Sequence, residues 1–125
     1  MSRSVRTLEI PFPLSVNQAY RSVRGTVLKS KAARIYQASV AEIGHAACSG
    51  AELMAGRLAI EMRVWCPDRR RRDLDNLWKL PLDALSGIVW VDDSQFDDKR
   101  IIRAGISRDA ARAVLSIWTL ADADM

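Results

Sequence analysis

Histidine and cysteine are scarce in this chain of 125 residues, which contains one histidine and two cysteines. Cys48 and Cys66 do not form a CxxC pair, and His45 stands alone on a predicted helix of small residues. Zinc sites are built from clustered cysteine and histidine ligands, so we expect no zinc site. Two unpatterned thiols fit a reducing compartment better than a disulfide scaffold. We interpret His45 as a helix residue rather than a general base.

Long apolar runs are also missing. No run reaches the roughly eighteen apolar residues that a spanning helix needs, and no N-terminal signal-like segment is present. We therefore expect neither secretion nor a membrane span, and a cytoplasmic location. Repeats and linkers are absent as well, and the apolar fraction of 49% with 27% charged residues is typical of a globular chain. We expect residues 1–125 to form a single domain.

The charges are unevenly distributed along the chain. Residues 1–72 contain 13 Lys and Arg against 5 Asp and Glu, whereas residues 73–125 contain 6 against 10. Fifteen of the nineteen basic residues are arginine, the side chain better suited to bidentate phosphate contact. This asymmetry favours a polyanion-binding surface beside a metal site.

Four segments read as β-strands. Alternating apolar and polar residues predict strands at residues 5–12 and 57–66, each ending at proline. Residues 99–107 and 112–120 are predicted to form a hairpin, with Asp97 and Asp98 in a polar turn before it. Residues 14–30 are predicted to be a polar, basic loop that turns at Gly25, and the tail 121–125 is expected to be frayed.

Two segments read as helices. The first is predicted over residues 31–48, with Ser30 as its N-cap and Ile35, Val40 and Ile43 on its apolar stripe. The second is predicted over residues 74–85, with Gly87 as its C-terminal cap and with Pro81 kinking it or splitting it in two. The order of elements indicates an α+β (mixed α/β) fold, in which two main helices pack on a mixed sheet of about four strands.

The most informative stretch is residues 69–93, where four arginines directly precede two aspartates. The run Arg69, Arg70, Arg71 and Arg72 is followed by Asp73 and Asp75, and a second acidic pair follows at Asp92 and Asp93. Adjacent arginines repel one another unless an anion lies across them, and clustered aspartates need a cation. A polyanion on the arginines and a divalent metal on the aspartates would satisfy both, as in a metal-dependent enzyme acting on nucleic-acid phosphates.

The spacing of Asp73 and Asp75 predicts the backbone conformation of this segment. On a helix these side chains would point about 200° apart, whereas on an extended segment they share a face. We therefore expect an extended or turn conformation at the helix entrance. Asp92-Asp93 is expected on a loop that returns to the same end. Three carboxylates from two segments, completed by water and phosphate oxygens, would suit Mg²⁺ or Mn²⁺.

Lys79 lies four residues after Asp75 and is expected on the same helical face. It could reach the scissile phosphate or the charge that develops on the leaving oxygen. Alternatively, it forms an ordinary surface ion pair with Asp75. A DxD motif with a nearby lysine also occurs in glycosyltransferases and phosphatases, so the motif alone does not decide between these functions. The adjoining arginine run favours nucleic acid.

Two parts of the chain together resemble a known family. The first part runs from Pro67 to Leu77 and continues with Lys79, Leu82–Leu85 and Asp92–Gln95; the second is Pro11–Asn17 with Tyr20-Arg21 behind it. These residues resemble the RusA-type Holliday junction resolvases, small crossover-junction endodeoxyribonucleases often carried by prophages. The resemblance spans nearly the whole chain.

The resemblance implies a homodimer that binds branched DNA at four-way junctions and nicks two strands symmetrically, with Mg²⁺ or alternatively Mn²⁺ and no organic cofactor. It places the protein in the cytoplasm of a bacterial or phage-infected cell. Asp73, Asp75 and Asp93 would bind the metal and take part in catalysis with Lys79, although the choice between Asp92 and Asp93 stays open. The implied DNA contacts are Ser15, Asn17, Gln18, Arg21, Arg69, Arg70, Arg71, Arg72, Asn76 and Lys79.

Two other functions remain open. One is a catalytically inactive junction-binding protein of prophage origin, which would bind junctions without nicking them. The other is a metal-dependent phosphotransfer enzyme acting on nucleotides, for which the arginine run has no clear purpose. The basic stretch Arg21, Arg24, Lys29, Lys31 and Arg34 is expected to contact the backbone of a junction arm, and Tyr20 could stack on an unpaired base.

Overall fold

The computed structural model describes residues 5–120, so the predicted frayed tail lies outside the described residues. Its elements are β1 (Val5–Pro11), α1 (Val16–Ala19), β2 (Tyr20–Val23), β3 (Thr26–Lys29), α2 (Lys31–Ala47), β4 (Leu58–Cys66), the 3-10 helix η1 (Leu74–Leu77), α3 (Lys79–Leu85), the 3-10 helix η2 (Asp93–Gln95), β5 (Phe96–Ile106) and β6 (Arg112–Thr119). The expected α+β class is confirmed. Within residues 5–120, no helix is long and apolar enough to cross a membrane.

The main sheet has four strands in the order β1-β6-β4-β5. β6 runs antiparallel to both β1 and β4, and β5 runs parallel to β4. The predicted hairpin of residues 99–107 and 112–120 is therefore wrong, because β4 lies between the two strands. β6 alternates buried Ala113, Leu115 and Ile117 and suits the centre of a sheet, whereas the mostly exposed, charged β5 suits an edge. Asp97 and Asp98, predicted as a turn, begin this edge strand.

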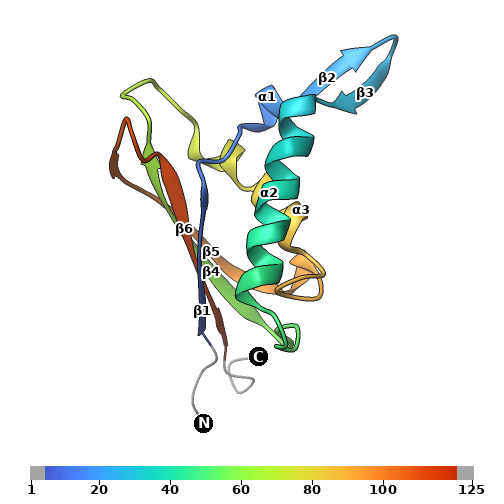
Figure 1. The fold of residues 1–125 in the computed structure, drawn as a ribbon, viewed down its shortest axis with the longest axis vertical. Helices are drawn as coiled ribbons and strands as arrows, with labels where there is room; N and C mark the ends of the chain where they lie inside the picture. The colour runs from blue at the N-terminus through green and yellow to red at the C-terminus, as the bar shows by residue number, and fades with distance from the viewer. Residues whose placement is uncertain (1–4, 121–125) are drawn as a thin grey trace.

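The helices cover one face of the sheet, as Figure 1 shows for α2 and α3. On that face β4 contributes Leu58, Ile60, Met62 and Val64, which are all fully buried. Leu115 and Ile117 of β6 join them in the same core cluster. The alternate residues of β4 and β6 point to the opposite face, because successive strand side chains alternate. That second face carries the half-buried Trp65 and Trp118 and has no covering layer within the described residues.

Helix α2 begins as predicted, with the Ser30 hydroxyl accepting from Ala33 N at 3.1 Å. Of the predicted apolar stripe, Val40 is buried and Ile43 packs against the core, but Ile35 is 58% exposed. The buried face of α2 contains Ala33, Tyr36, Val40 and Gly44. Small residues line this face because α3 and the loop after it come close. A Cβ atom on Gly44 would lie 2.7 Å from Leu85 Cδ2, well inside van der Waals contact.

The predicted helix at residues 74–85 is split in two, η1 and α3, with Trp78 between them. Pro81 is the third residue of α3, in the first turn, where its missing N–H leaves no intrahelical bond unmade. Gly87 has a positive φ of 85° directly after the C-cap residue Ser86, which confirms the predicted terminating glycine.

Residues 14–30 are more ordered than the predicted loop. They contain the short helix α1 and a separate two-stranded sheet, β2–β3, which projects away from the body at the upper right of Figure 1. The turn predicted at Gly25 is present: Arg24 and Gly25 both have positive φ, 50° and 79°. These angles fit a type I′ hairpin turn. These two strands have no apolar periodicity in the sequence, because Arg21–Val23 and Thr26–Lys29 are all exposed.

Candidate active site

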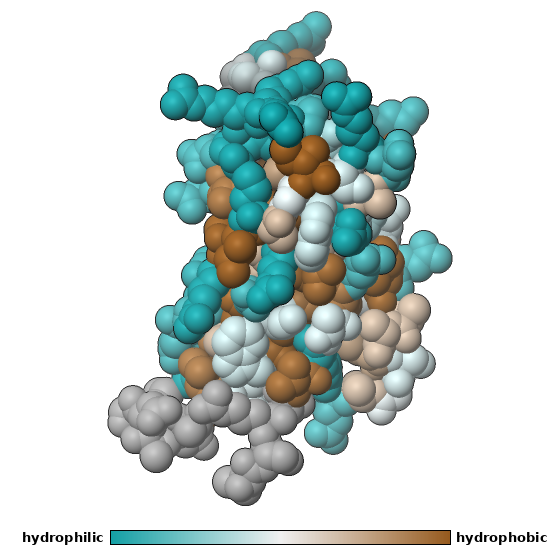
Figure 2. Space-filling model, turned by 90° about the vertical axis from the view of Figure 1, so that its left-hand side faces the viewer, coloured by the Kyte–Doolittle hydropathy of each residue, from teal (hydrophilic) through white to brown (hydrophobic). Residues whose placement is uncertain are grey.

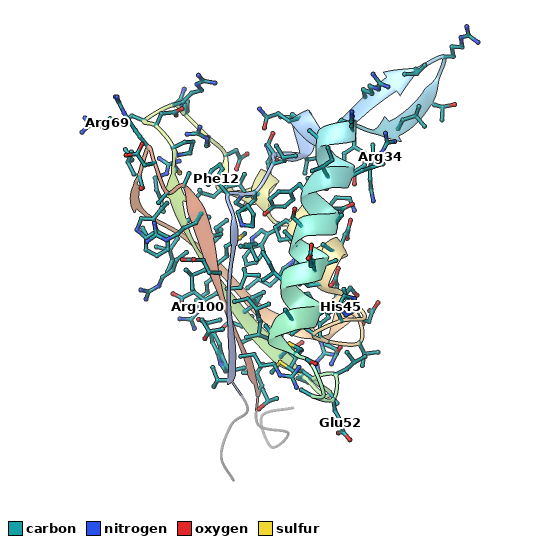
Figure 3. The ribbon with its side chains drawn as sticks, viewed as in Figure 1. Phe12, Arg34, His45, Glu52, Arg69 and Arg100 are labelled. Carbon is teal, nitrogen blue, oxygen red and sulfur yellow. The ribbon has the colours of Figure 1, made fainter. Side chains whose placement is uncertain are left out.

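A surface cleft of about 400 Å³ separates two segments that are far apart in the sequence. One wall follows β1 and the other follows β4. Figure 3 places Phe12 of the first wall between the loop that carries Arg69 and helix α2. The lining residues are Phe12, Pro13, Leu14, Ser15, Asn17, Gln18, Pro67, Arg70, Arg71, Arg72, Asp73, Asn76 and Leu77. The structure thus brings together Ser15, Asn17 and Gln18 with Arg70, Arg71 and Arg72 around one cleft.

The arginine run is organised around Asp68. The Asp68 carboxylate accepts from Arg72 Nη1 at 2.8 Å and from the backbone N–H of Arg70 at 2.9 Å. These hydrogen bonds hold the pKa of Asp68 below its usual range. Arg72 also stacks over the Phe12 ring at 5.3 Å, so it links the two walls. Arg69, Arg70 and Arg71 are exposed and available to an anion.

The upper end of the molecule is strongly hydrophilic. Figure 2 looks onto the left-hand side of Figure 1, and hydrophilic residues dominate its upper part, where the loop of the arginine run lies. Below it the surface is mixed, with hydrophobic residues scattered among polar ones.

Asp73 adopts the extended conformation expected at the helix entrance, with φ −88° and ψ 113°. It is the N-cap of η1, and its Oδ1 accepts from the backbone N–H of Asp75 at 3.1 Å. Both side chains are exposed, and Asp73 lines the cleft beside the arginines. The negative charges at this helix start are stabilised by the free N–H groups there.

Lys79 does not form the ion pair with Asp75 that one interpretation predicted. The helix breaks at Trp78, and Lys79 begins α3, where its Nζ donates to Asp83 Oδ2 at 2.9 Å. This hydrogen bond raises the pKa of Lys79, and the charge of Asp83, Tyr20 and Asp93 acts in the same direction. Lys79 is therefore a protonated cation near neutral pH and not a base.

The two aspartates after α3 have different surroundings. Asp92 caps η2: its Oδ2 accepts from Ser94 N at 2.9 Å, which lowers its pKa. Asp93 is half-buried, and its Oδ1 accepts from the indole Nε1 of Trp90 at 2.7 Å. Burial raises the pKa of Asp93, the hydrogen bond from Trp90 opposes that rise, and nearby Asp83 adds to it. The charge of Asp93 is therefore felt at Lys79 and interacts with that of Asp83, whereas the Asp92 carboxylate caps the turn at η2.

The carboxylates have the right chemistry for a hard divalent cation, since Asp73, Asp75, Asp83 and Asp93 offer only oxygen donors. Their arrangement is open, because no three His, Cys, Asp or Glu side chains within residues 5–120 lie close enough to hold a metal ion together. The donor set fits such an ion, and the side chains of the two segments are not gathered around one point.

Comparison with known proteins identifies the family of the chain. The sequence model of the family described as Endodeoxyribonuclease RusA matches residues 11–117. The crossover junction endodeoxyribonuclease of Enterobacteria phage 82 is 37% identical over 105 residues, covering 81% of this chain and 84% of the relative. The protein of the same name from Escherichia coli K12 is also 37% identical, over 82% and 85% of the two chains. The chain belongs to the RusA family.

The RusA match begins at the last residue of β1 and includes both walls of the cleft, α3 and the Asp92-Asp93 segment. A Shigella sonnei relative with the same name, 36% identical, covers a similar share of the chain. Within this match, sequence reasoning missed Asp83 and Trp90, the partners of Lys79 and Asp93. The i, i+4 spacing of Lys79 and Asp83 could have revealed the first. Only the folded structure reveals the hydrogen bond between Trp90 and Asp93.

Proposed function

We propose that this chain is a structure-selective endodeoxyribonuclease that resolves four-way DNA junctions, the activity named for its RusA relatives. One observation carries the proposal: the cleft joins exposed arginines directly to the first acidic pair through Asp73. A DNA backbone lying on Arg70 and Arg71 would pass beside Asp73 and Asp75. Ser15, Asn17, Gln18 and Asn76 would contact the same strand from the two walls.

Asp73, Asp75 and Asp93 would hold the divalent cation, for which we propose Mg²⁺, with Mn²⁺ as a substitute. When bound, such an ion supplies Lewis-acid activation of water and neutralises phosphate charge. Asp93 is favoured over Asp92, because the charge of Asp93 acts on Lys79 and interacts with that of Asp83, whereas Asp92 does neither. Trp90 fixes the orientation of the Asp93 carboxylate from the core.

Lys79 would act as a fixed positive charge. Its raised pKa keeps the ammonium protonated, and Asp83 anchors the side chain at 2.9 Å. A cation held in place stabilises the extra negative charge of a phosphodiester as the bond to the leaving oxygen breaks. The hydrogen bond to Asp83 therefore orients Lys79 rather than removing it from the reaction.

We also propose that the protein acts as a homodimer. Two symmetric cuts in one junction require two active sites related by the same two-fold axis. The sheet face opposite the helices is where a partner could pack, because it carries the half-buried Trp65 and Trp118 and has no covering layer within residues 5–120. Ile102 on β5, 40% exposed, adds apolar surface. Light scattering of the protein at micromolar concentration tests the dimer directly.

The decisive experiment compares nicking of a labelled four-way junction and of linear duplex, with Mg²⁺, Mn²⁺ or EDTA. The unaltered protein should make paired symmetric nicks in the junction only, and EDTA should abolish them. Asp75→Asn should abolish nicking and leave junction binding nearly intact. Glu52→Gln, an exposed acid at the far end of the molecule in Figure 3, is the matched control and should nick normally.

The other outcomes separate the alternative functions. Junction binding without any nicks would identify an inactive junction-binding protein of prophage origin. Transfer or hydrolysis of nucleotide phosphates, indifferent to DNA branching, would identify a phosphotransfer enzyme. Full nicking by Asp75→Asn would show that the acidic residues have been assigned the wrong roles.

A further inference from the structure

The hairpin β2–β3, residues 20–29 and called the arm below, exposes apolar side chains without any covering layer. Every residue from Arg21 to Lys29 is exposed, including Val27 at 68%, Leu28 at 42% and Val23 at 39%. The arm is a sheet of its own and is not paired with the main sheet. A lone two-stranded hairpin is marginally stable in water, so exposed apolar residues on it point to a partner.

The root of the arm is firmly attached to the body. The backbone N–H of Ser30 donates to Ala19 O at 2.7 Å, and Lys29 Nζ donates to Gln37 Oε1 of α2 at 2.7 Å. Ala19 is fully buried, and Tyr20 packs against the core. The type I′ turn matches the natural twist of the two strands. The arm is therefore anchored at its root and projects from a defined place on the body.

The arm carries apolar residues on both of its faces. The register pairs Arg21 with Leu28 and Val23 with Thr26 on one face, and Ser22 with Val27 on the other. A flat partner would cover one face and leave the other in water. Both faces are covered only if the arm enters a gap in its partner.

Charge identifies the partner as a polyanion. No acidic residue lies between Glu9 and Glu42, while the arm itself carries Arg21, Arg24 and Lys29. The uncompensated positive charge disfavours a second copy of the same arm as the occupant. At its root the arm joins the cleft through Asn17 and Gln18, so a partner on the arm is continuous with the DNA proposed for the cleft.

We propose that the arm inserts into the centre of the four-way DNA junction. There Val23, Val27 and Leu28 contact base-pair faces that are exposed where the duplex arms separate. Arg21, Arg24 and Lys29 contact the phosphates around the opening. Apolar side chains that wedge between base steps are a known means of opening a duplex, and strands of four residues reach about 13 Å. The inference rests on the proposed function and assigns to the arm its preference for junctions over duplex.

The test uses a junction with 2-aminopurine at its centre, studied in EDTA so that no strand is cut. The unaltered protein should raise the fluorescence as bases unstack. The triple variant Val23→Ser, Val27→Ser, Leu28→Ser should lose that rise, and its preference for junction over linear duplex should fall about tenfold. Its affinity for linear duplex should stay within about twofold, because the arm's basic residues are unchanged.

Leu53→Ser is the matched control. Leu53 is 39% exposed, the same as Val23, and lies next to Glu52 at the opposite end of the molecule in Figure 3. This variant should retain both the fluorescence rise and the junction preference. Because all three substituted arm residues are exposed, the circular dichroism of the triple variant should match that of the unaltered protein.

A triple variant that keeps both the fluorescence rise and the junction preference would overturn the inference. Equal losses on junction and duplex would overturn it too, since the arm would then be an ordinary groove contact. A change in oligomeric state would show that the arm binds a second copy instead. If the unaltered protein shows no preference for the junction over duplex, the proposed function is wrong. If the unaltered protein and the triple variant prefer the junction equally, the proposed function stands and only the role of the arm is wrong.

Discussion

Trp90→Phe removes the donor that orients Asp93 while keeping an aromatic ring in the core. Trp90 is fully buried, and its Nε1 donates to Asp93 Oδ1 at 2.7 Å. A hydrogen bond to a charged group contributes about 1.5–3 kcal/mol to stability, and the half-exposed Asp93 carboxylate places this one in the lower part of that range. Phe96 packs edge-on against Trp90, with the ring centroids 4.8 Å apart. The smaller ring of Phe leaves unfilled volume there, which lowers the free energy of unfolding by about 1–2 kcal/mol more.

Urea denaturation of Trp90→Phe should therefore show a loss of about 3 kcal/mol in the free energy of unfolding. A double-mutant cycle with Asp93→Ala separates the hydrogen bond from the packing, and its coupling energy should be about 1.5–2 kcal/mol. Trp118→Phe, a half-buried tryptophan on the open sheet face, is the matched control and should lose less. A coupling energy below about 0.5 kcal/mol would refute the idea that Trp90 holds Asp93 in place.

Three further predictions follow from individual contacts. Burial raises the pKa of Tyr36, so above about pH 10 the folded protein retains the phenol proton that the unfolded chain loses. The free energy of unfolding should therefore fall as the pH rises above about 10, and Tyr36→Phe should abolish that fall in urea titrations. Gly44→Val should lower the free energy of unfolding by about 2–3 kcal/mol in thermal denaturation, because even a Cβ atom would lie 2.7 Å from Leu85 Cδ2. Unchanged stability would mean that α2 and α3 pack less closely than the structure shows. Asp83→Asn should change stability by less than about 0.5 kcal/mol, because the ion pair with Lys79 is half-exposed, yet it should slow single-turnover nicking; equal rates would show that Lys79 needs no anchor.

The strands and helices with one buried face were predictable from the sequence, whereas the pairing of the strands was not. From Ile60 to Cys66, β4 alternates buried residues with less buried ones, and α2 starts at a serine cap, so local patterns define both. Strands adjacent in sequence usually pair, and that rule suggested the wrong hairpin. The exposed residues of the arm produce no periodic pattern at all, although Gly25 between the β-branched Val23 and Thr26 is a usable turn signal.

The site was predictable where one segment carries it and unpredictable where two segments meet. The extended conformation of Asp73 follows from the position of the acidic pair before a helix. The facing wall of the cleft depends on where β1 ends relative to β4, which sequence patterns do not specify. The partner of Lys79 was also misjudged, because the break at Trp78 ends the continuous helix that would have placed it beside Asp75.

The position of β6 has a consequence for the synthesis of the protein. β6 is the last described strand, and it is the only neighbour of β1 in the sheet. Until residues 112–119 leave the ribosome, β1 has no strand to pair with. Leu8 then cannot pair with Leu115, nor Ile10 with Ala113. The wall of the cleft that follows β1 is then unsupported. If the cleft binds DNA as proposed, nascent chains would bind it poorly until this late strand closes the sheet, and this long-range step also slows folding.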